Sequence, residues 1–224
     1  DNGSDAPLGP AHAVACAAPL RGKKGAHYEG GMRVPFIAAW AEVDEGNPHQ
    51  QRLPIARGVL QRQQAAVYDL FPTILSAANV TPPGDYVSDG VGLQSLFTGK
   101  PDKGRPEVFL MHYPHGPHRS NYFSCLRYGD WKVIYHYVPS AASHGSHYQL
   151  YHLGRDPFES QNLVGAEPVQ LRKMMRELRH RLKSCGAAYP IQGKDDQRPR
   201  LPKIPPEARK QVSALSAAKA IKTL

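Results

Sequence analysis

The chain has 224 residues, of which 41% are hydrophobic, and a formal net charge of +9 at pH 7. This length and composition are typical of a globular protein with one main domain and appendages. No segment approaches the roughly 18 consecutive apolar residues of a membrane helix, so we expect no membrane partner. The chain begins at Asp1 without a basic start or an apolar segment, and no targeting signal is recognised.

The positive charge is concentrated near the C-terminal end. Residues 186–224 hold eight Lys or Arg and three Asp or Glu, which is more than half of the net charge. The same segment is rich in Pro and ends in an Ala/Lys-rich stretch, so we expect a solvated linker followed by a short helix. A polyanion-binding arm is the alternative, and we expect no nucleic-acid partner.

The first half of the chain has the pattern of an α/β domain. Residues 34–40 form a nearly continuous apolar run, which predicts a strand buried on both faces of a parallel sheet. Residues 65–79 predict a short strand that runs into a helix, with Asp69 as the N-cap. The apolar face expected for this helix consists of Leu70, Ile74, Leu75 and Ala78.

From Glu107 onward the pattern changes to short β-rich runs. Four strands are expected, at residues 108–113, 122–128, 131–137 and 148–153. Only Gly129 and Asp130 separate the second from the third, which predicts a tight hairpin and an antiparallel sheet. Residues 169–182 carry apolar side chains at helical spacing and predict an amphipathic helix that covers one face of this sheet.

The three cysteines are Cys16, Cys125 and Cys185. They are widely spaced and form no CxxC pair, so a zinc site is not predicted, whereas a single disulfide stays open.

The opening Asp1-Asn2-Gly3 can present a carboxylate oxygen beside an amide oxygen. Both are hard ligands that suit Ca²⁺ or Mg²⁺. The same tripeptide is also an ordinary turn, and the residues alone leave both readings open.

A glycine-rich basic loop, LRGKKGAHYEGGMRVP, occupies residues 20–35. Glycines on both sides let the backbone approach an anion closely, while Lys24 offers a compact charge with three donors. The alternative is a flexible basic loop. Seven of the eleven histidines lie between His112 and His152, and His112 and His115 flank a Tyr-Pro pair at an expected strand end.

Six segments resemble successive motifs of the formylglycine-dependent sulfatase family, in the family's order. They are DNG (1–3), LRGKKGAHYEGGMRVP (20–35), VYDLFPTIL (67–75), HYPHG (112–116), LRYGDWKVI (126–134) and LYHLGRDPFESQNLV (150–164). The later ones are similar to the C-terminal subdomain of bacterial arylsulfatases and polysaccharide sulfatases. The block from LRGxKG to GGMRVP is the most specific.

The resemblance implies an α/β fold of the alkaline-phosphatase-like class. Residues 1–106 would be the C-terminal portion of the α/β catalytic domain, with part of a mainly parallel sheet. Residues 107–185 would be a small four-stranded antiparallel subdomain with a packed helix, and residues 186–224 a basic, Pro-rich tail.

The resemblance also implies functional residues. The divalent cation of the family, most often Ca²⁺ with Mg²⁺ as the alternative, would be held by Asp1 and Asn2. Two protein ligands are few for Ca²⁺, so we expect weak binding by this chain alone. Lys24 matches the lysine that contacts the sulfate oxygens, and His112 and His115 would face the substrate at the mouth of the site.

No segment matches the formylglycine motif, because Cys16 is followed by Pro and Arg one place too late. The formylglycine is therefore expected upstream, in a missing N-terminal half that would be the main partner of this chain. The isolated chain should then be inactive.

We expect the C-terminal part of a sulfuric ester hydrolase that acts on sulfated carbohydrates or aryl sulfates, in the periplasm or outside the cell. The alternative is a non-catalytic, sulfatase-like module that binds sulfated polyanions. A related phosphoesterase is disfavoured by the LRGxKG and GGMRVP motifs.

Overall fold

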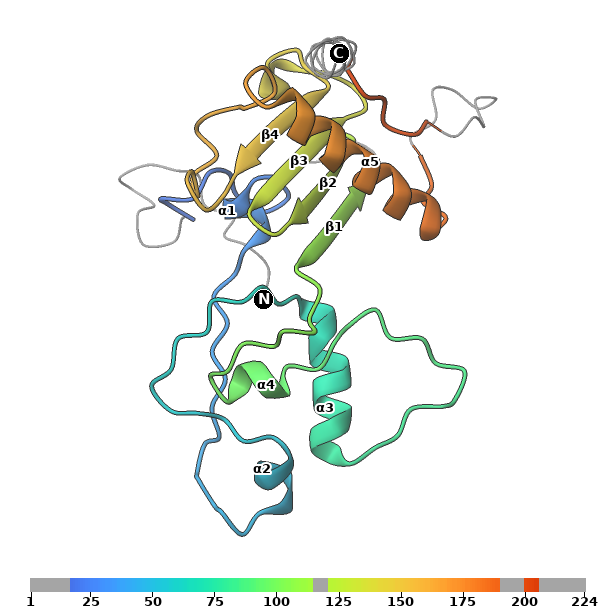
Figure 1. The fold of residues 1–224 in the computed structure, drawn as a ribbon. Coiled ribbons are helices and arrows are strands. Elements are labelled where there is room, and N and C mark those ends of the chain that lie inside the picture. The colour runs from blue at the N-terminus through green and yellow to red at the C-terminus, as the bar shows by residue number, and fades with distance from the viewer. Residues whose placement is uncertain (1–16, 115–120, 190–199, 206–224) are drawn as a thin grey trace, which may run out of the picture. The chain divides into compact units, whose positions relative to one another are not determined.

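The computed structural model describes residues 17–114, 121–189 and 200–205. The chain folds as two compact units, which are described separately (Figure 1). Unit 1 contains the described residues up to Val34 together with those from Val108 onward, and unit 2 comprises residues Pro35–Glu107. The segment around Lys24 therefore belongs to unit 1, and the expected assignment of residues 1–106 to one catalytic portion stays a prediction.

Unit 1 is built on a four-stranded antiparallel sheet in the order β1-β2-β3-β4. The strands are β1 (Val108–Tyr113), β2 (Phe123–Tyr128), β3 (Trp131–His136) and β4 (Tyr148–His152). The turn between β2 and β3 consists of two residues, and Gly129 takes a φ of +57° that suits glycine. The four-stranded antiparallel sheet expected from the sequence is confirmed.

The two faces of this sheet are both covered, because alternate side chains of each strand pack on opposite sides. On one face Leu126, Val133 and Leu150 pack against α5 (Pro168–Ser184). On the other face Cys125 and Ile134 pack with Tyr28, beside α1 (Glu29–Met32). Figure 1 shows α5 crossing one side of the sheet.

Helix α5 begins with Pro168 at a position where proline is tolerated, and it ends near Cys185, before Gly186 at a φ of +60°. Its apolar stripe is fully buried, which confirms the predicted amphipathic helix. The stripe consists of Leu171, Met174, Met175, Leu178 and Leu182. A 3₁₀ turn, η3 (Ala141–Ser143), lies between β3 and β4.

Unit 2 contains short helices joined by long loops. They are α2 (Pro48–Arg52), the 3₁₀ turn η2 (Val67–Asp69), α3 (Leu70–Ala78) and α4 (Gln94–Phe97). None of the helices in the described ranges of the chain is long and apolar enough to cross a membrane.

Two strands expected within residues 34–40 and 65–68 are not formed, so these predictions are wrong for the described chain. The apolar side chains there are solvent-exposed, with Ile37 at 90% and Val67 at 80%. A strand buried on both faces needs hydrogen-bonding neighbours and covering helices, and the described part of unit 2 contains no strand. The helix after residue 69 is confirmed, although its expected apolar face leaves Ile74 62% exposed.

Asp69 precedes α3 as expected but does not cap it with its side chain. Its carboxylate instead accepts hydrogen bonds from the backbone N–H groups of Ala66 (2.7 Å) and Val91 (2.9 Å), and it pairs with Arg105. Asp69 therefore joins three separate parts of unit 2 through polar contacts.

Candidate functional site

The Lys24 loop, residues 20–28, folds back against α1, and its backbone conformation requires several glycines. Gly22 and Gly25 adopt φ values of +87° and +83°. A Cβ on Gly30 would lie only 2.6 Å from the Arg21 carbonyl oxygen, and one on Gly31 would lie 2.5 Å from that of Ala26. Glycine is therefore required at both places by the close approach of the loop backbone.

The two lysines of this loop differ in their surroundings. Lys24 is half-buried, whereas Lys23 is exposed. Within the described ranges, the Lys24 side chain has no ion-pair or hydrogen-bond partner. Its role in binding an anion stays a prediction.

A buried ionic cluster lies directly beneath this loop, and sequence reasoning missed it. Lys132 of β3 is fully buried, and its Nζ lies 2.9 Å from Glu29 Oε1 and 2.8 Å from Glu159 Oε1. Arg127 adds a more distant cation, with Nη1 3.7 Å from Glu29 Oε2. The only local signal was a lysine inside an otherwise apolar strand, which does not reveal its partners.

The cluster perturbs the protonation of its members. Burial acts to lower the pKa of Lys132, but the pKa is raised overall by its interactions with Cys125, Glu159 and Glu29. Burial raises the pKa of Glu159, and the charge of Lys132 offsets part of this effect. The ion pairs keep Lys132 charged inside the protein, where an isolated ammonium would not remain so.

Arg21, at the start of the loop, is held by several groups. Its Nη1 donates to the Glu159 carbonyl oxygen at 2.8 Å and to Tyr151 Oη at 3.2 Å. The guanidinium also lies 3.8 Å from the centre of the Tyr28 ring. Because Tyr28 Oη in turn bonds with Gln149 at 3.1 Å, the loop is tied to β4.

Two buried histidines adjoin the same region. The rings of His27 and His136 lie 4.7 Å apart, edge to face. Neither ring nitrogen of His27 has a hydrogen-bond partner in the described structure. Burial, and then the neighbouring His136, Lys132 and Arg21, lower the pKa of His27 from 6.5 to about 2. His27 is therefore a neutral core residue.

Of the other predicted site residues, Asp1, Asn2 and His115 lie outside the described residues, as does Cys16, which the sequence does not assign to the site. His112 lies in β1, and its Nδ1 is 2.7 Å from Ser124 Oγ, while its Nε2 contacts the Ala188 carbonyl oxygen.

His112 alternates with Met111 and Tyr113, which pack on the side of the Lys24 loop. The structure thus places the His112 side chain on the opposite, α5-covered face, and its substrate contact stays a prediction. Cys125 and Cys185 are both free thiols, so the disulfide left open by the sequence does not join them.

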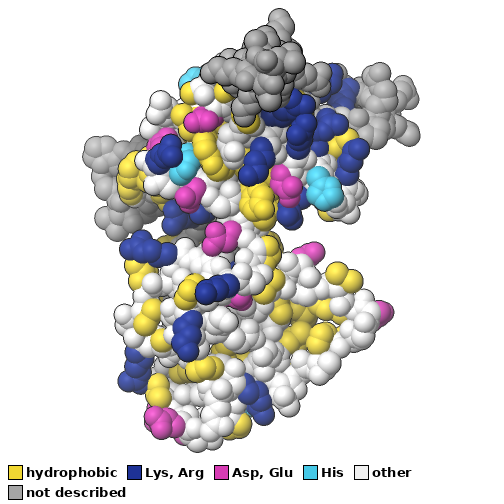
Figure 2. Space-filling view, viewed as in Figure 1, with side chains coloured by type: hydrophobic (Ala, Val, Ile, Leu, Met, Phe, Trp, Pro, Cys, Tyr) yellow, Lys and Arg dark blue, Asp and Glu magenta, His cyan; other side chains and the backbone are white. Residues whose placement is uncertain are grey.

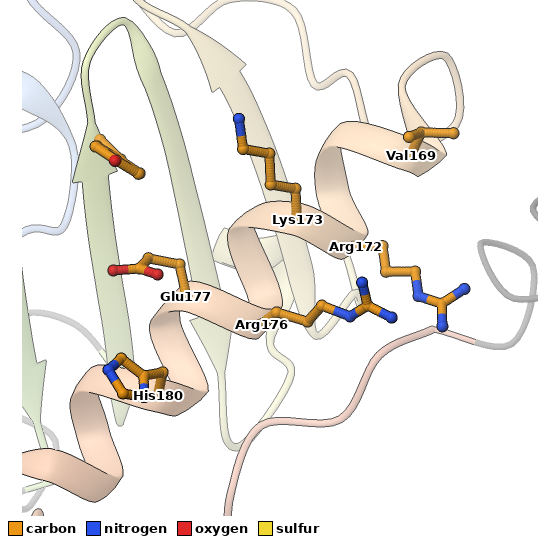
Figure 3. A pocket seen from close by; sticks show the side chains of 7 residues that line it. Val169, Arg172, Lys173, Arg176, Glu177 and His180 are labelled. Atoms are coloured by element: carbon orange, nitrogen blue, oxygen red, sulfur yellow. The ribbon is translucent and has the colours of Figure 1, made fainter.

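A surface groove of about 630 Å³ runs along α5 beside Tyr128 (Figure 3). It is lined by Lys173, Arg176, Glu177 and His180, among others. Figure 3 shows Lys173 and Arg176 pointing in different directions, so their charges do not converge on one point. The groove belongs to the α5 side of the sheet and is not part of the Lys24 site. Among the described side chains, no group of three or more His, Cys, Asp or Glu is placed to hold a metal ion.

Residues 23–187 match the family described as N-sulphoglucosamine sulphohydrolase, C-terminal. The chain is similar to arylsulfatase A of Homo sapiens, with 30% identity over 198 positions that cover 79% of this chain and 36% of the relative. It is also similar to N-acetylgalactosamine-6-sulfatase of Canis lupus familiaris, with 30% identity over 148 positions, 59% of this chain and 26% of the relative. The chain thus spans about a quarter to a third of the length of these relatives.

Solved structures agree in fold. The crystal structure of Ps i-CgsB matches with a TM-score of 0.52 at 22% identity and covers 73% of this chain and 32% of that chain. A sulfatase structure from Bacteroides thetaiotaomicron, BT33336S-sulf, matches with a TM-score of 0.52 at 24% identity and covers 74% of this chain and 32% of that chain. The family match covers most of the motif-bearing chain, including Lys24 and the buried cluster. The chain therefore belongs to the sulfatases, as the C-terminal part of a member of the N-sulphoglucosamine sulphohydrolase family.

Proposed function

We propose that this chain is the C-terminal part of a sulfuric ester hydrolase and that Lys24 binds the sulfate oxygens of the substrate. The observation that carries the proposal is the half-buried Lys24, which has no partner among the described residues and lies on a loop fixed by close-packed glycines. A preorganised ammonium of this kind stabilises negative charge as it develops on sulfate oxygens and needs no proton transfer.

The names of the relatives support a proposal for the substrate class. The two relatives are named an arylsulfatase and an N-acetylgalactosamine-6-sulfatase, and Ps i-CgsB was also solved with k-i-k-neocarrahexaose. We infer a sulfated carbohydrate or an aryl sulfate as the substrate here, with His115 as a proposed contact. His112 faces α5, on the other side of the sheet from the Lys24 loop, so its proposed contact would involve a part of the substrate distant from the sulfate group held by Lys24. The same family membership supports a location in the periplasm or outside the cell.

Asp1 and Asn2 would hold the divalent cation. Their carboxylate and amide oxygens fit Ca²⁺ best and Mg²⁺ as the alternative. When bound, the cation would supply positive charge for the sulfate oxygens, and the formylglycine would come from an upstream N-terminal half.

That upstream half is also the proposed partner of unit 2. Figure 2 shows apolar side chains at the surface of this unit. Phe36, Ile37, Phe71 and Ile74 are all more than 45% exposed, although they come from the two segments expected to be core elements of an α/β sheet. Exposed apolar side chains from expected core elements support an interface with another part of the protein. We infer that the missing half covers it.

The test compares the isolated chain with the chain joined to its native upstream half, using a chromogenic aryl sulfate. The joined protein should turn over, and its Lys24→Ala variant should lose about 10²- to 10³-fold in rate. Lys23→Ala is the matched control, because Lys23 is exposed and adjacent in sequence. Turnover by the isolated chain, or full activity of the Lys24→Ala variant, would overturn the proposal. An inactive joined protein that binds sulfated polysaccharide would favour a non-catalytic module.

A further inference from the structure

We propose that Lys132 is a positioning residue: its buried ammonium group holds Glu29 and Glu159 together and thereby fixes the loop that presents Lys24. The catalytic consequence rests on the function proposed above, whereas the structural part can be tested without it.

The cluster forms a closed set of contacts. Lys132 Nζ lies 2.9 Å from Glu29 Oε1 and 2.8 Å from Glu159 Oε1. The other oxygen of Glu159, Oε2, accepts a 2.6 Å hydrogen bond from the backbone N–H of Glu29. Each of the three residues therefore contacts both of the others, and all three are at most 3% exposed.

This set of contacts anchors both ends of the segment that contains Lys24. At its start, Arg21 donates to the Glu159 carbonyl oxygen at 2.8 Å. At its end, Glu29 is bound by Glu159 and Lys132, and the next residue, Gly30, donates its N–H to the Arg21 carbonyl oxygen at 2.7 Å. Lys24 lies between these two anchor points, so its position depends on the cluster although it does not touch it.

The backbone of Glu159 gives independent support. It takes a φ of +54°, a left-handed conformation that is uncommon for a residue with a side chain. Such a conformation persists only where its surroundings hold it in place. At this point it directs the Glu159 carbonyl oxygen to Arg21 and the carboxylate to Lys132 and Glu29.

The energetics also favour a positioning role. A buried ion pair contributes little net stability compared with an apolar replacement, because desolvation offsets the attraction. What a buried pair can supply is a single arrangement of the segments it joins, and removing one partner leaves uncompensated charge. Loss of Lys132 leaves two carboxylates close together under the loop, with Arg127 and Arg33 as more distant cations, at 3.7 and 3.8 Å from Glu29 Oε2.

The structural test is hydrogen exchange on the full chain. In Lys132→Met, amides of residues 20–32 should exchange about tenfold faster or more, while those of α5 keep their rates. Met175→Ala is the matched control, since Met175 is equally buried but lies in α5, on the opposite face of the sheet. This substitution should speed amide exchange in α5 and leave residues 20–32 unchanged. Unchanged exchange in residues 20–32 would overturn the proposal.

If Lys132→Met unfolds the whole unit, its exchange rates no longer report on the loop alone, and a second variant is then needed. Lys132→Met combined with Glu29→Gln removes one charge of each sign and should restore part of the lost protection in residues 20–32. Failure of this combination to protect the loop better than Lys132→Met alone would also overturn the charge-based role.

The catalytic test is a double-mutant cycle in the chain joined to its upstream half. If Lys132 acts through Lys24, Lys132→Met lowers kcat in the parent but has little further effect in the Lys24→Ala background. Equal fold-losses in both backgrounds would contradict the proposal. If the joined protein shows no turnover at all, the proposed function fails, and the exchange experiment still decides the role of Lys132.

Discussion

The Asp69 carboxylate and the Arg105 guanidinium form an ion pair inside unit 2, where both side chains are almost completely buried. Arg105 also donates to the carbonyl oxygens of Gln64 and Val91, each at 2.9 Å. The pair thus closes the segment from residue 64 to residue 105 around α3.

Removing the cation of that pair should destabilise unit 2. Arg105→Met leaves the Asp69 charge buried and unpaired, which typically costs about 3–5 kcal/mol. Trp40 lies in unit 2 and bonds to the Leu53 carbonyl oxygen at 2.9 Å, so its fluorescence in a Trp131→Phe background reports the unfolding of this unit by urea. Arg62→Met, at an exposed position, is the control and should keep the parental midpoint. A parental midpoint for Arg105→Met would contradict the role of the pair.

His27 should make the stability of unit 1 dependent on pH. The pKa of His27 is about 2 in the folded protein and 6.5 in the unfolded chain, so below pH 6.5 the unfolded chain binds a proton that the folded protein does not. The contribution of neutral His27 to the free energy of unfolding is therefore complete above pH 6.5 and is lost as the pH falls toward 2. The loss amounts to about 1.4 kcal/mol per pH unit in this window. Between pH 7.5 and pH 5, the parent should therefore lose about 2 kcal/mol more than His27→Leu in urea unfolding.

The same substitution has a second expected result. Because both ring nitrogens of His27 are unpaired in the described structure, leucine removes a desolvation penalty and should not destabilise the protein at pH 7.5. His180→Leu, on the exposed side of α5, is the control and should retain the parental pH dependence. Identical pH profiles for the parent and His27→Leu would refute the assignment.

Gly30→Ala should disrupt the packing of the Lys24 loop backbone against α1. The added Cβ would lie 2.6 Å from the Arg21 carbonyl oxygen and 2.7 Å from that of Gly22, and backbone atoms cannot rotate away. We expect a loss of about 1–3 kcal/mol, measured by thermal unfolding. Gly165→Ala adds the same methyl group where no atom lies within 4 Å, and it should be close to neutral. Equal melting temperatures for both variants would rule out the close approach as the reason for this glycine.

The thiols should react very differently. Cys125 is fully buried, and burial raises its pKa to about 12, whereas Cys185 is exposed. In a Cys16→Ser background, a thiol reagent should modify one cysteine in the native protein and two in denaturant. Rapid labelling of both cysteines under native conditions would show that the sheet opens far more readily than its packing indicates.

The sheet and α5 could be predicted because their signals are local. Alternating side chains, a two-residue turn and an apolar stripe at helical spacing are each read within a few residues. The strand expected at residues 34–40 failed because burial of an apolar run depends on neighbours that the run does not encode. The Lys132 cluster could not be found in this way, since Lys132 lies 103 residues from Glu29 and no local pattern links them.

Glu29 and Glu159, which hold the Lys24 loop, are far apart in the sequence. This separation affects when the loop can become anchored during translation. Glu29 leaves the ribosome 130 residues before Glu159, the partner that binds its backbone N–H. At ordinary elongation rates of about 5–20 residues per second, this interval lasts roughly 7–26 s. During that time the loop lacks the contacts of Arg21 and Glu29 with Glu159. The segment that presents Lys24 is thus translated well before the residue that anchors it, and the contact of Glu29 with Glu159 can form only after Glu159 has been made.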